Sequence, residues 1–338
     1  MKIDELGEFG LIDRIRRALP GPGADVLVGI GDDVAVLDTD GEQLWLATCD
    51  VQMEGAHFIR SAIAPRGLGH KALAINLSDI AAKGGTPRFA LVSLGLPADL
   101  TVEFVDELYA GLRAEAETFN TEIVGGNISR SQLGLFIDIF VLGQAPRENV
   151  MLRSGARVGD NILVTGALGD AAAAVARLLR SEHATTRGYA ERARARLNRP
   201  TPRIREGQLI GATHWATAML DISDGLASDL GHICERSEVG ARISAAALPV
   251  AEENRALSGA AHGDEWHLAL FGGEDYELLF TAPAAHAEVL AHHIEHETGT
   301  RVSIIGEILP ASDGRQLVLP DGRITPLEAR GWDHFKHE

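Results

Sequence analysis

The sequence is poor in cysteine, in positive charge and in long apolar runs. Its two cysteines, Cys49 and Cys234, exclude a disulfide framework and a Cys-x-x-Cys metal site. A formal net charge of −17 argues against nucleic acid or an anionic membrane as the main partner, although an anionic small molecule can bind where metal cations lie between it and the protein. No run approaches the roughly 18 apolar residues of a membrane span, and residues 1–20 lack the apolar core of a signal peptide. We therefore expect a cytoplasmic protein.

Several common phosphate-binding and catalytic motifs are also missing. The chain has no P-loop, no protein-kinase signature and no G-x-S-x-G nucleophile elbow. No histidine spacing indicates a zinc site, because His292, His293 and His296 share a charged stretch that is typical of a solvated helix face. If the protein carries out phosphate chemistry, it does so on a different scaffold.

What is present is an alternation of strand-like and helix-like segments. Apolar periodicity predicts helices at 3–19 and 68–83, with strand-like runs between and after them. A polar, basic stretch at 145–160 separates two apolar blocks, and the chain is long enough for about two domains. We therefore expect an α/β fold with α+β layers, in which residues 1–148 form an N-terminal domain and residues 149–338 form a C-terminal α/β domain.

Carboxylates recur beside glycine, serine or threonine at the ends of apolar runs. Each of them could be a turn or a helix cap on its own, because aspartate and serine favour both. Five such stretches make coincidence less attractive, and hard cations such as Mg²⁺ prefer carboxylate oxygens and recruit nucleotide phosphates. The stretches are GIGDD (Asp32, Asp33), ATCDV (Asp50), NLSDIAAKGG (Asp79), LDISDG (Asp221, Asp224) and FGGEDYE (Glu274, Asp275, Glu277).

Two glycine-rich stretches predict turns that can receive phosphate. They are VGGN at 124–127 and TGALGD at 165–170. The second stretch opens a helix, and the free N–H groups and the dipole of a helix N-terminus favour anions.

Taken in order over nearly the whole chain, these motifs resemble the thiamine-monophosphate kinase family. The resemblance rests on GIGDDVAVL, HKALAINLSDIAAKGGTPRFALVSLGLP, RSGARVGD, VTGALGD, LDISDGLASDLGHI, FGGEDYELLFT and GWDHF. NLSDIAA and DISDGLASDLGHI are shared with the superfamily of aminoimidazole ribonucleotide synthetase, whereas GGEDYEL and GWDHF are more specific to the thiamine-phosphate branch. The resemblance implies a homodimer of two-domain chains that pairs strands of the N-terminal domains. It also implies that thiamine monophosphate, ATP and several Mg²⁺ ions are the partners.

The resemblance further implies roles for individual residues. The implied metal ligands are Asp32, Thr48, Asp50, Asp79, Asn127, Asp221 and Asp224. The implied ATP-binding residues are Tyr109, Gly126, Asn127, Arg153 and Ser223. The implied thiamine-phosphate residues are His57, Glu274 and Trp332. An aromatic face and a carboxylate suit a cationic thiazolium ring.

The implied reaction is metal-assisted, in-line transfer of the γ-phosphoryl group to the phosphate of thiamine monophosphate. The acceptor oxygen is already ionised near neutral pH, so no catalytic base or nucleophile is expected, and Asp33 is expected to be positional. Two departures from the family pattern are Cys49, where threonine is frequent, and Asn127, where the family has aspartate. The alternatives are an inactive nucleotide or thiamine-phosphate binding protein of the same fold, and another ATP-dependent enzyme of the superfamily.

Overall fold

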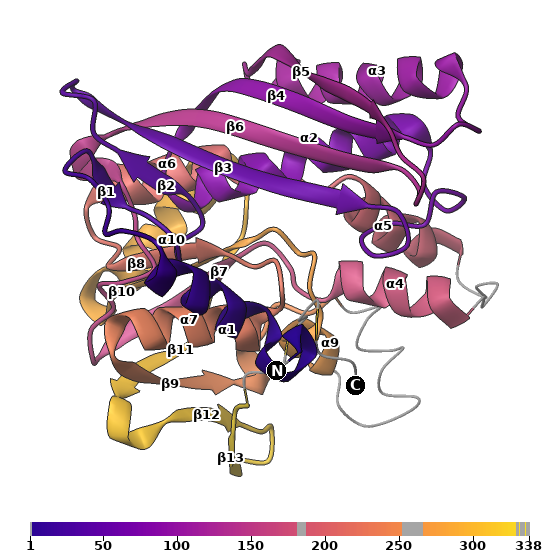
Figure 1. Cartoon of the computed structure of the whole chain (residues 1–338). Helices are drawn as coiled ribbons and strands as arrows, with labels where there is room; N and C mark the ends of the chain where they lie inside the picture. Colours follow the sequence, from indigo (N-terminus) through magenta and orange to yellow (C-terminus); the bar gives the residue numbers. More distant parts are fainter. Residues whose placement is uncertain (1, 181–186, 252–265, 329–330, 332–334, 336–338) are drawn as a thin grey trace.

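The computed structural model describes residues 2–180, 187–251, 266–328, 331 and 335. The first half of the chain forms a six-stranded sheet with the order β1-β2-β3-β6-β4-β5, in which only β4 and β5 are parallel neighbours (upper part of Figure 1). Its elements are α1 (Ile3–Ala18), β1 (Val26–Val28), β2 (Ala35–Leu37), β3 (Gln43–Met53), α2 (Pro65–Ala82), β4 (Thr86–Leu96), α3 (Val102–Thr118), β5 (Glu122–Arg130) and β6 (Phe136–Pro146).

The second half forms a seven-stranded sheet with the order β13-β12-β9-β11-β7-β10-β8, in the lower part of Figure 1. Its elements are β7 (Asp160–Thr165), α4 (Asp170–Arg180), α5 (Arg187–Asn198), α6 (Ile204–Thr213), β8 (Ala218–Asp221), α7 (Leu226–Ser237), β9 (Val239–Ser244), α9 (His267–Phe271), β10 (Leu278–Pro283), α10 (Ala284–Thr298), β11 (Val302–Pro310), β12 (Arg315–Val318) and β13 (Ile324–Pro326). Two mixed sheets with helices confirm the predicted α/β class.

Helix α2 lies at the seam between the two halves. It packs against β3 and β6 of the first sheet, and also against α6 and β8 of the second half. Most of its residues are buried, because a helix that is apolar all round can be covered on every side. Its close crossing with α3 requires glycine, since a Cβ atom at Gly69 would lie 2.0 Å from the carbonyl oxygen of Leu108. No described helix combines the length and the apolar character that a bilayer crossing requires.

The face of the first sheet that carries Cys49 is left partly open. Along β3, buried and exposed side chains alternate, as the two-residue period of a strand requires. Val51 and Met53 therefore remain 38% and 46% exposed, and Leu91 of β4, which the register places on the same face, is 40% exposed. The predicted turn at VGGN is wrong, because Gly125 and Gly126 lie inside the edge strand β5 and pair with β4.

Candidate active site

Each predicted acidic stretch contributes to one cavity of about 1620 Å³, lined by both halves of the chain, although Asp275 and Glu277 of the last stretch do not line it. Strand ends, helix α2 and the loops around β8 bring together residues far apart in the sequence. The predicted site residues that line this cavity are Asp32, Thr48, Asp50, His57, Asp79, Arg153, Asp221, Ser223, Asp224 and Glu274.

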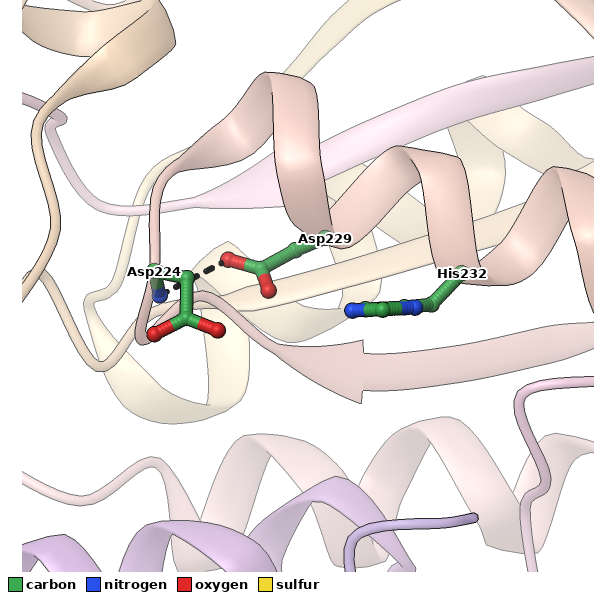
Figure 2. Close-up of side chains that lie close together, drawn as sticks. All are labelled: Asp224, Asp229 and His232. Atoms are coloured by element: carbon green, nitrogen blue, oxygen red, sulfur yellow. Dashed lines mark hydrogen bonds between the residues drawn. The ribbon is translucent and has the colours of Figure 1, made fainter. Parts of the chain in front are cut away.

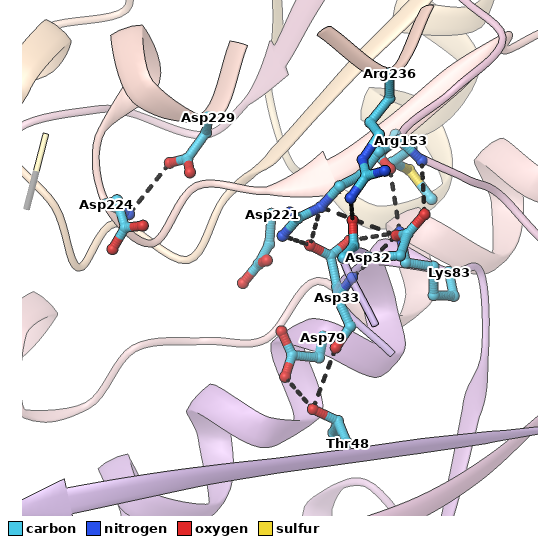
Figure 3. Close-up of polar contacts among 12 residues, drawn as sticks. Asp32, Asp33, Thr48, Asp79, Lys83, Arg153, Asp221, Asp224, Asp229 and Arg236 are labelled. Carbon is cyan, nitrogen blue, oxygen red and sulfur yellow. Dashed lines mark hydrogen bonds and ion pairs between the residues drawn. The ribbon is translucent and has the colours of Figure 1, made fainter. Parts of the chain in front are cut away.

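The middle of the cavity holds an acidic centre, which consists of Asp33, Asp79 and Asp221. One carboxylate oxygen of each residue lies within 4.8 Å of the others. The Thr48 hydroxyl donates to Asp79 at 2.5 Å (Figure 3). The Ser78 hydroxyl donates to Asp221 at 2.6 Å. No described lysine or arginine forms an ion pair with Asp79 or Asp221.

The pKa values of Asp79 and Asp221 show that ionisation of both carboxylates is unfavourable in this centre. Burial raises the pKa of Asp79 well above its ordinary value, and repulsion from Asp50, Asp221 and Asp33 adds to the rise. Burial also raises the pKa of Asp221 to about 7, with a further contribution from Asp33. Close carboxylates that cannot all ionise are a suitable donor set for hard divalent cations. The residues present therefore fit Mg²⁺.

Asp32 and Asp33 differ from Asp79 and Asp221 because two cations, one lysine and one arginine, form ion pairs with them. Lys83 forms ion pairs with Asp32, at 2.5 Å, and with Asp33. Arg153 donates through Nε to Asp33 at 2.8 Å, and its backbone N–H contacts Asp32 at 3.4 Å. Burial alone would raise the pKa of Asp33, but Arg153 and Lys83 outweigh burial and hold it below its ordinary value. We call Asp32, Asp33, Lys83 and Arg153 the charge quartet.

A second group follows the end of β8, where Asp224, Asp229 and His232 offer ligand atoms within 4.8 Å of one another (Figure 2). The Asp229 carboxylate accepts the backbone N–H groups of Asp224 at 3.2 Å and Gly225 at 3.0 Å. It thereby holds the turn that leads into α7. Burial lowers the pKa of His232 to about 4, and Arg153 adds to this effect, so the ring is neutral near pH 7. We call these three residues the loop group.

The predicted thiamine-phosphate side joins the two halves through a buried lysine. Lys71 of α2, 2% exposed at its side chain, forms an ion pair with Glu274 and contacts the carbonyl oxygen of His57 at 3.5 Å. Glu274 has a φ of +69°, a conformation that costs energy for a residue other than glycine and is concentrated at functional sites. Its backbone N–H donates to the Ser223 carbonyl at 2.7 Å.

Three of the predicted site residues that the structure describes do not line the cavity. Tyr109 is half-buried on α3, and Asn127 is exposed on β5 with its amide 3.3 Å from the Ser129 hydroxyl. Packing alone requires glycine at position 126, since a Cβ atom there would lie 1.8 Å from the Val92 carbonyl oxygen. Trp332 lies outside the described residues.

Neither the TGALGD stretch nor Cys49 is available for the binding role that the sequence suggests for such residues. In TGALGD, the backbone N–H of Gly169 donates to the Asp275 carboxylate at 3.0 Å, so a protein carboxylate occupies the position expected for phosphate. Cys49 lies on the opposite face of β3 from Thr48, with Sγ 3.4 Å from Asp138. Burial and the Asp138 carboxylate raise the pKa of the thiol to about 11, so it is neutral.

The sequence-based prediction missed Lys71, Lys83 and Asp229. A usable signal was present for the two lysines, because both occur in the apolar stretch HKALAINLSDIAAKGG. Lysine is almost never fully buried unless it is paired, so such a position predicts a carboxylate partner. For Asp229 the signal is weaker, since aspartate in the first turn of a helix is ordinary.

Comparisons with known proteins agree with this site. The models of the AIR synthase related protein, N-terminal domain and C-terminal domain, match residues 31–145 and 157–317. The chain is thus an AIR synthase related protein. Thiamine-monophosphate kinases from Aquifex aeolicus and Escherichia coli K12 are 38% and 36% identical to it; the alignments cover 99% and 97% of this chain and 100% and 98% of those proteins.

A solved structure described as AaThiL complexed with AMPPCP and TMP superposes with a TM-score of 0.83 at 37% identity, covering 99% of each chain. The chain belongs to the thiamine-monophosphate kinase family.

Proposed function

We propose that this protein transfers the γ-phosphoryl group of ATP to thiamine monophosphate, giving ADP and thiamine diphosphate. A phosphate oxygen of thiamine monophosphate forms the new bond to the γ-phosphorus, and the bond from that phosphorus to the β,γ-bridging oxygen breaks. The observation that carries the proposal is the cavity in which Asp79 and Asp221 face open space without an ion-pair partner among the described residues. Relatives with this activity match the chain from end to end.

We infer that Mg²⁺ is held by the carboxylates of Asp50, Asp79, Asp221 and Asp224, with the Thr48 hydroxyl beside them. When bound, Mg²⁺ screens the negative charge of two phosphate groups that must approach each other and of the phosphoryl group in transit. Arg153 and Ser223 line the same cavity and are suited to orient the nucleotide. His57 and Glu274 are suited to bind thiamine phosphate, because the thiazolium ring is a cation.

We also propose that two chains associate through the open face of the first sheet. Val51, Met53 and Leu91 are exposed on this face, and a second copy would remove their apolar surface from water. The strand register brings Asn127 opposite Ser93, on the same face as Leu91. Asn127 is therefore suited to an interface role, and a second copy offers a route by which it can approach nucleotide. Sedimentation of the wild type and of Leu91→Glu tests this, with a dimer and a monomer as the expected results.

A turnover assay tests the catalytic proposal. Purified protein with ATP, Mg²⁺ and thiamine monophosphate is expected to release ADP and thiamine diphosphate in equal amounts. Free thiamine is expected to be a poor acceptor, because its alcohol oxygen is not ionised near neutral pH, unlike a phosphate oxygen of thiamine monophosphate. Nucleotide binding by calorimetry without turnover identifies an inactive binding protein, and good turnover of formylglycinamidine ribonucleotide identifies another enzyme of the superfamily. Either result contradicts the proposal.

A further inference from the structure

Lys83 is a fully buried cation inside the acidic cavity. It follows the C-terminus of α2, and none of its side chain is exposed. Its ammonium group is in ion-pair contact with both Asp32 and Asp33, and it lies 3.4 Å from the carbonyl oxygen of Met219. A buried ammonium group has a large desolvation cost, which only close anionic partners offset. Lys83 therefore holds Asp32 and Asp33 in place.

The charges divide the cavity into two unequal parts. The charge quartet contains two carboxylates and two cations, Lys83 and Arg153, so its formal charges cancel. Asp79 and Asp221 receive hydroxyl donors from Thr48 and Ser78 instead, and no described residue forms an ion pair with them. A divalent cation gains most where negative charge is uncompensated, and it must displace or repel Lys83 to use Asp32 or Asp33.

We propose that Lys83 is a built-in cation that substitutes for one metal ion at Asp32 and Asp33. Divalent metal is then directed to Asp79 and Asp221, and Asp32 acts as a partner of Lys83 instead of a metal ligand. The inference rests on the proposed function for the identity of the metal as Mg²⁺. Its test measures metal binding without ATP or thiamine monophosphate. The inference about Lys83 can therefore fail while the proposed function holds, and the reverse.

A purely structural role for Lys83 makes a different prediction. In that case Lys83 only ties the end of α2 to the loop of Asp32 and to β8 through Met219. Its removal would lower stability and leave the number of bound metal ions unchanged. Metal stoichiometry therefore separates the two roles.

The experiment compares Mn²⁺ binding to the wild type and to Lys83→Met by equilibrium dialysis and electron paramagnetic resonance. Methionine keeps much of the volume and removes the charge. We expect Lys83→Met to bind one additional Mn²⁺ per chain, or to bind Mn²⁺ about tenfold more tightly, because the Asp32 and Asp33 carboxylates become available. Lys71→Met is the matched control: it removes the other buried ammonium group of the same segment, which is paired with Glu274, and should leave Mn²⁺ binding at the acidic centre unchanged.

Unchanged stoichiometry and affinity in folded Lys83→Met overturn the proposal, as does a gain in Lys83→Met that persists when Asp32→Asn is added. If Lys83→Met folds only when Mn²⁺ is present, metal has taken over the role of the lysine, which supports the proposal. If it does not fold in either condition, Lys83→Met combined with Asp33→Asn avoids the unpaired buried charge. That double variant should bind Mn²⁺ through Asp32 more tightly than Asp33→Asn alone, and equal binding by the two overturns the proposal.

Discussion

The acidic centre and the loop group have similar composition, but their carboxylates accept hydrogen bonds from different donors. In the loop group, the Asp229 carboxylate accepts two backbone N–H groups and so holds a turn, although burial and repulsion from Asp224 and Asp221 raise its pKa well above the ordinary value. In the acidic centre, Asp79 and Asp221 receive one side-chain hydroxyl each and repel the carboxylates around them. Proximity of carboxylates is therefore not enough to define a metal site. Whether a carboxylate is available to a metal depends on the hydrogen-bond donors and cations that already contact it.

The largest effect is expected when the acidic centre is disabled. Asp79→Asn should lower kcat/KM at least about 100-fold, because one carboxylate is lost from the set proposed to hold the Mg²⁺ that screens the transferred phosphoryl group. The same change should raise the melting temperature of the metal-free protein, since burial and repulsion disfavour this carboxylate. Turnover assays and thermal unfolding in EDTA measure the two effects. Near-native activity at low magnesium would show that Asp79 is structural.

A smaller effect is expected in the loop group. Asp229→Ala removes the acceptor of the Asp224 and Gly225 N–H groups, which should cost about 1–3 kcal/mol of stability and lower kcat about tenfold by displacing Asp224. Asp229→Asn is the control, because an amide oxygen can still accept hydrogen bonds. Denaturant unfolding and steady-state kinetics provide the measurements. If the Asn variant loses Mn²⁺ affinity as severely as the Ala variant, Asp229 is a metal ligand and the contrast between the groups fails.

The acidic centre also predicts a pH dependence of the stability of the metal-free protein. The pKa of Asp221 is about 7 in the folded state, above its ordinary value of 3.8, so the folded state holds its proton more strongly than the unfolded state. The contribution is fully present below about pH 4 and is lost as the pH rises through 7. We expect the melting temperature in EDTA to fall by several degrees over this window, beyond any change in Asp221→Asn.

Magnesium should reverse that loss near neutral pH, because binding to the folded state alone stabilises it. A flat pH profile in EDTA, equal to that of Asp221→Asn, would show that Asp221 has an ordinary pKa.

The smallest effect is expected outside both groups, at Asn127. Asn127→Asp should lower the magnesium concentration for half-maximal activity about two- to threefold if this exposed position approaches metal in the assembled protein, because it adds one carboxylate. Magnesium titrations at saturating ATP measure it. An unchanged titration with normal activity would assign Asn127 to the strand β5 alone.

Much of the site was predictable from local patterns. Asp32, Asp50, Asp79, Asp221 and Asp224 each stand beside small residues at the end of an apolar run, and the structure brings all of them to one cavity. The open question at each was whether a turn or a ligand explains the aspartate. That question has no local answer, because it depends on donors supplied by other elements.

The sequence by itself determined the fold class, the family and the residues that can carry the chemistry, since periodicity and motif order are local properties of the chain. Only the tertiary structure decided which carboxylates are neutralised. Lys83 meets Asp32 across 51 positions and Lys71 meets Glu274 across 203, and a pairing at such separations depends on how helices and sheets pack. The same holds for Gly125 and Gly126, which pair with β4 and so form part of a strand. The turn preference of glycine does not predict this backbone pairing.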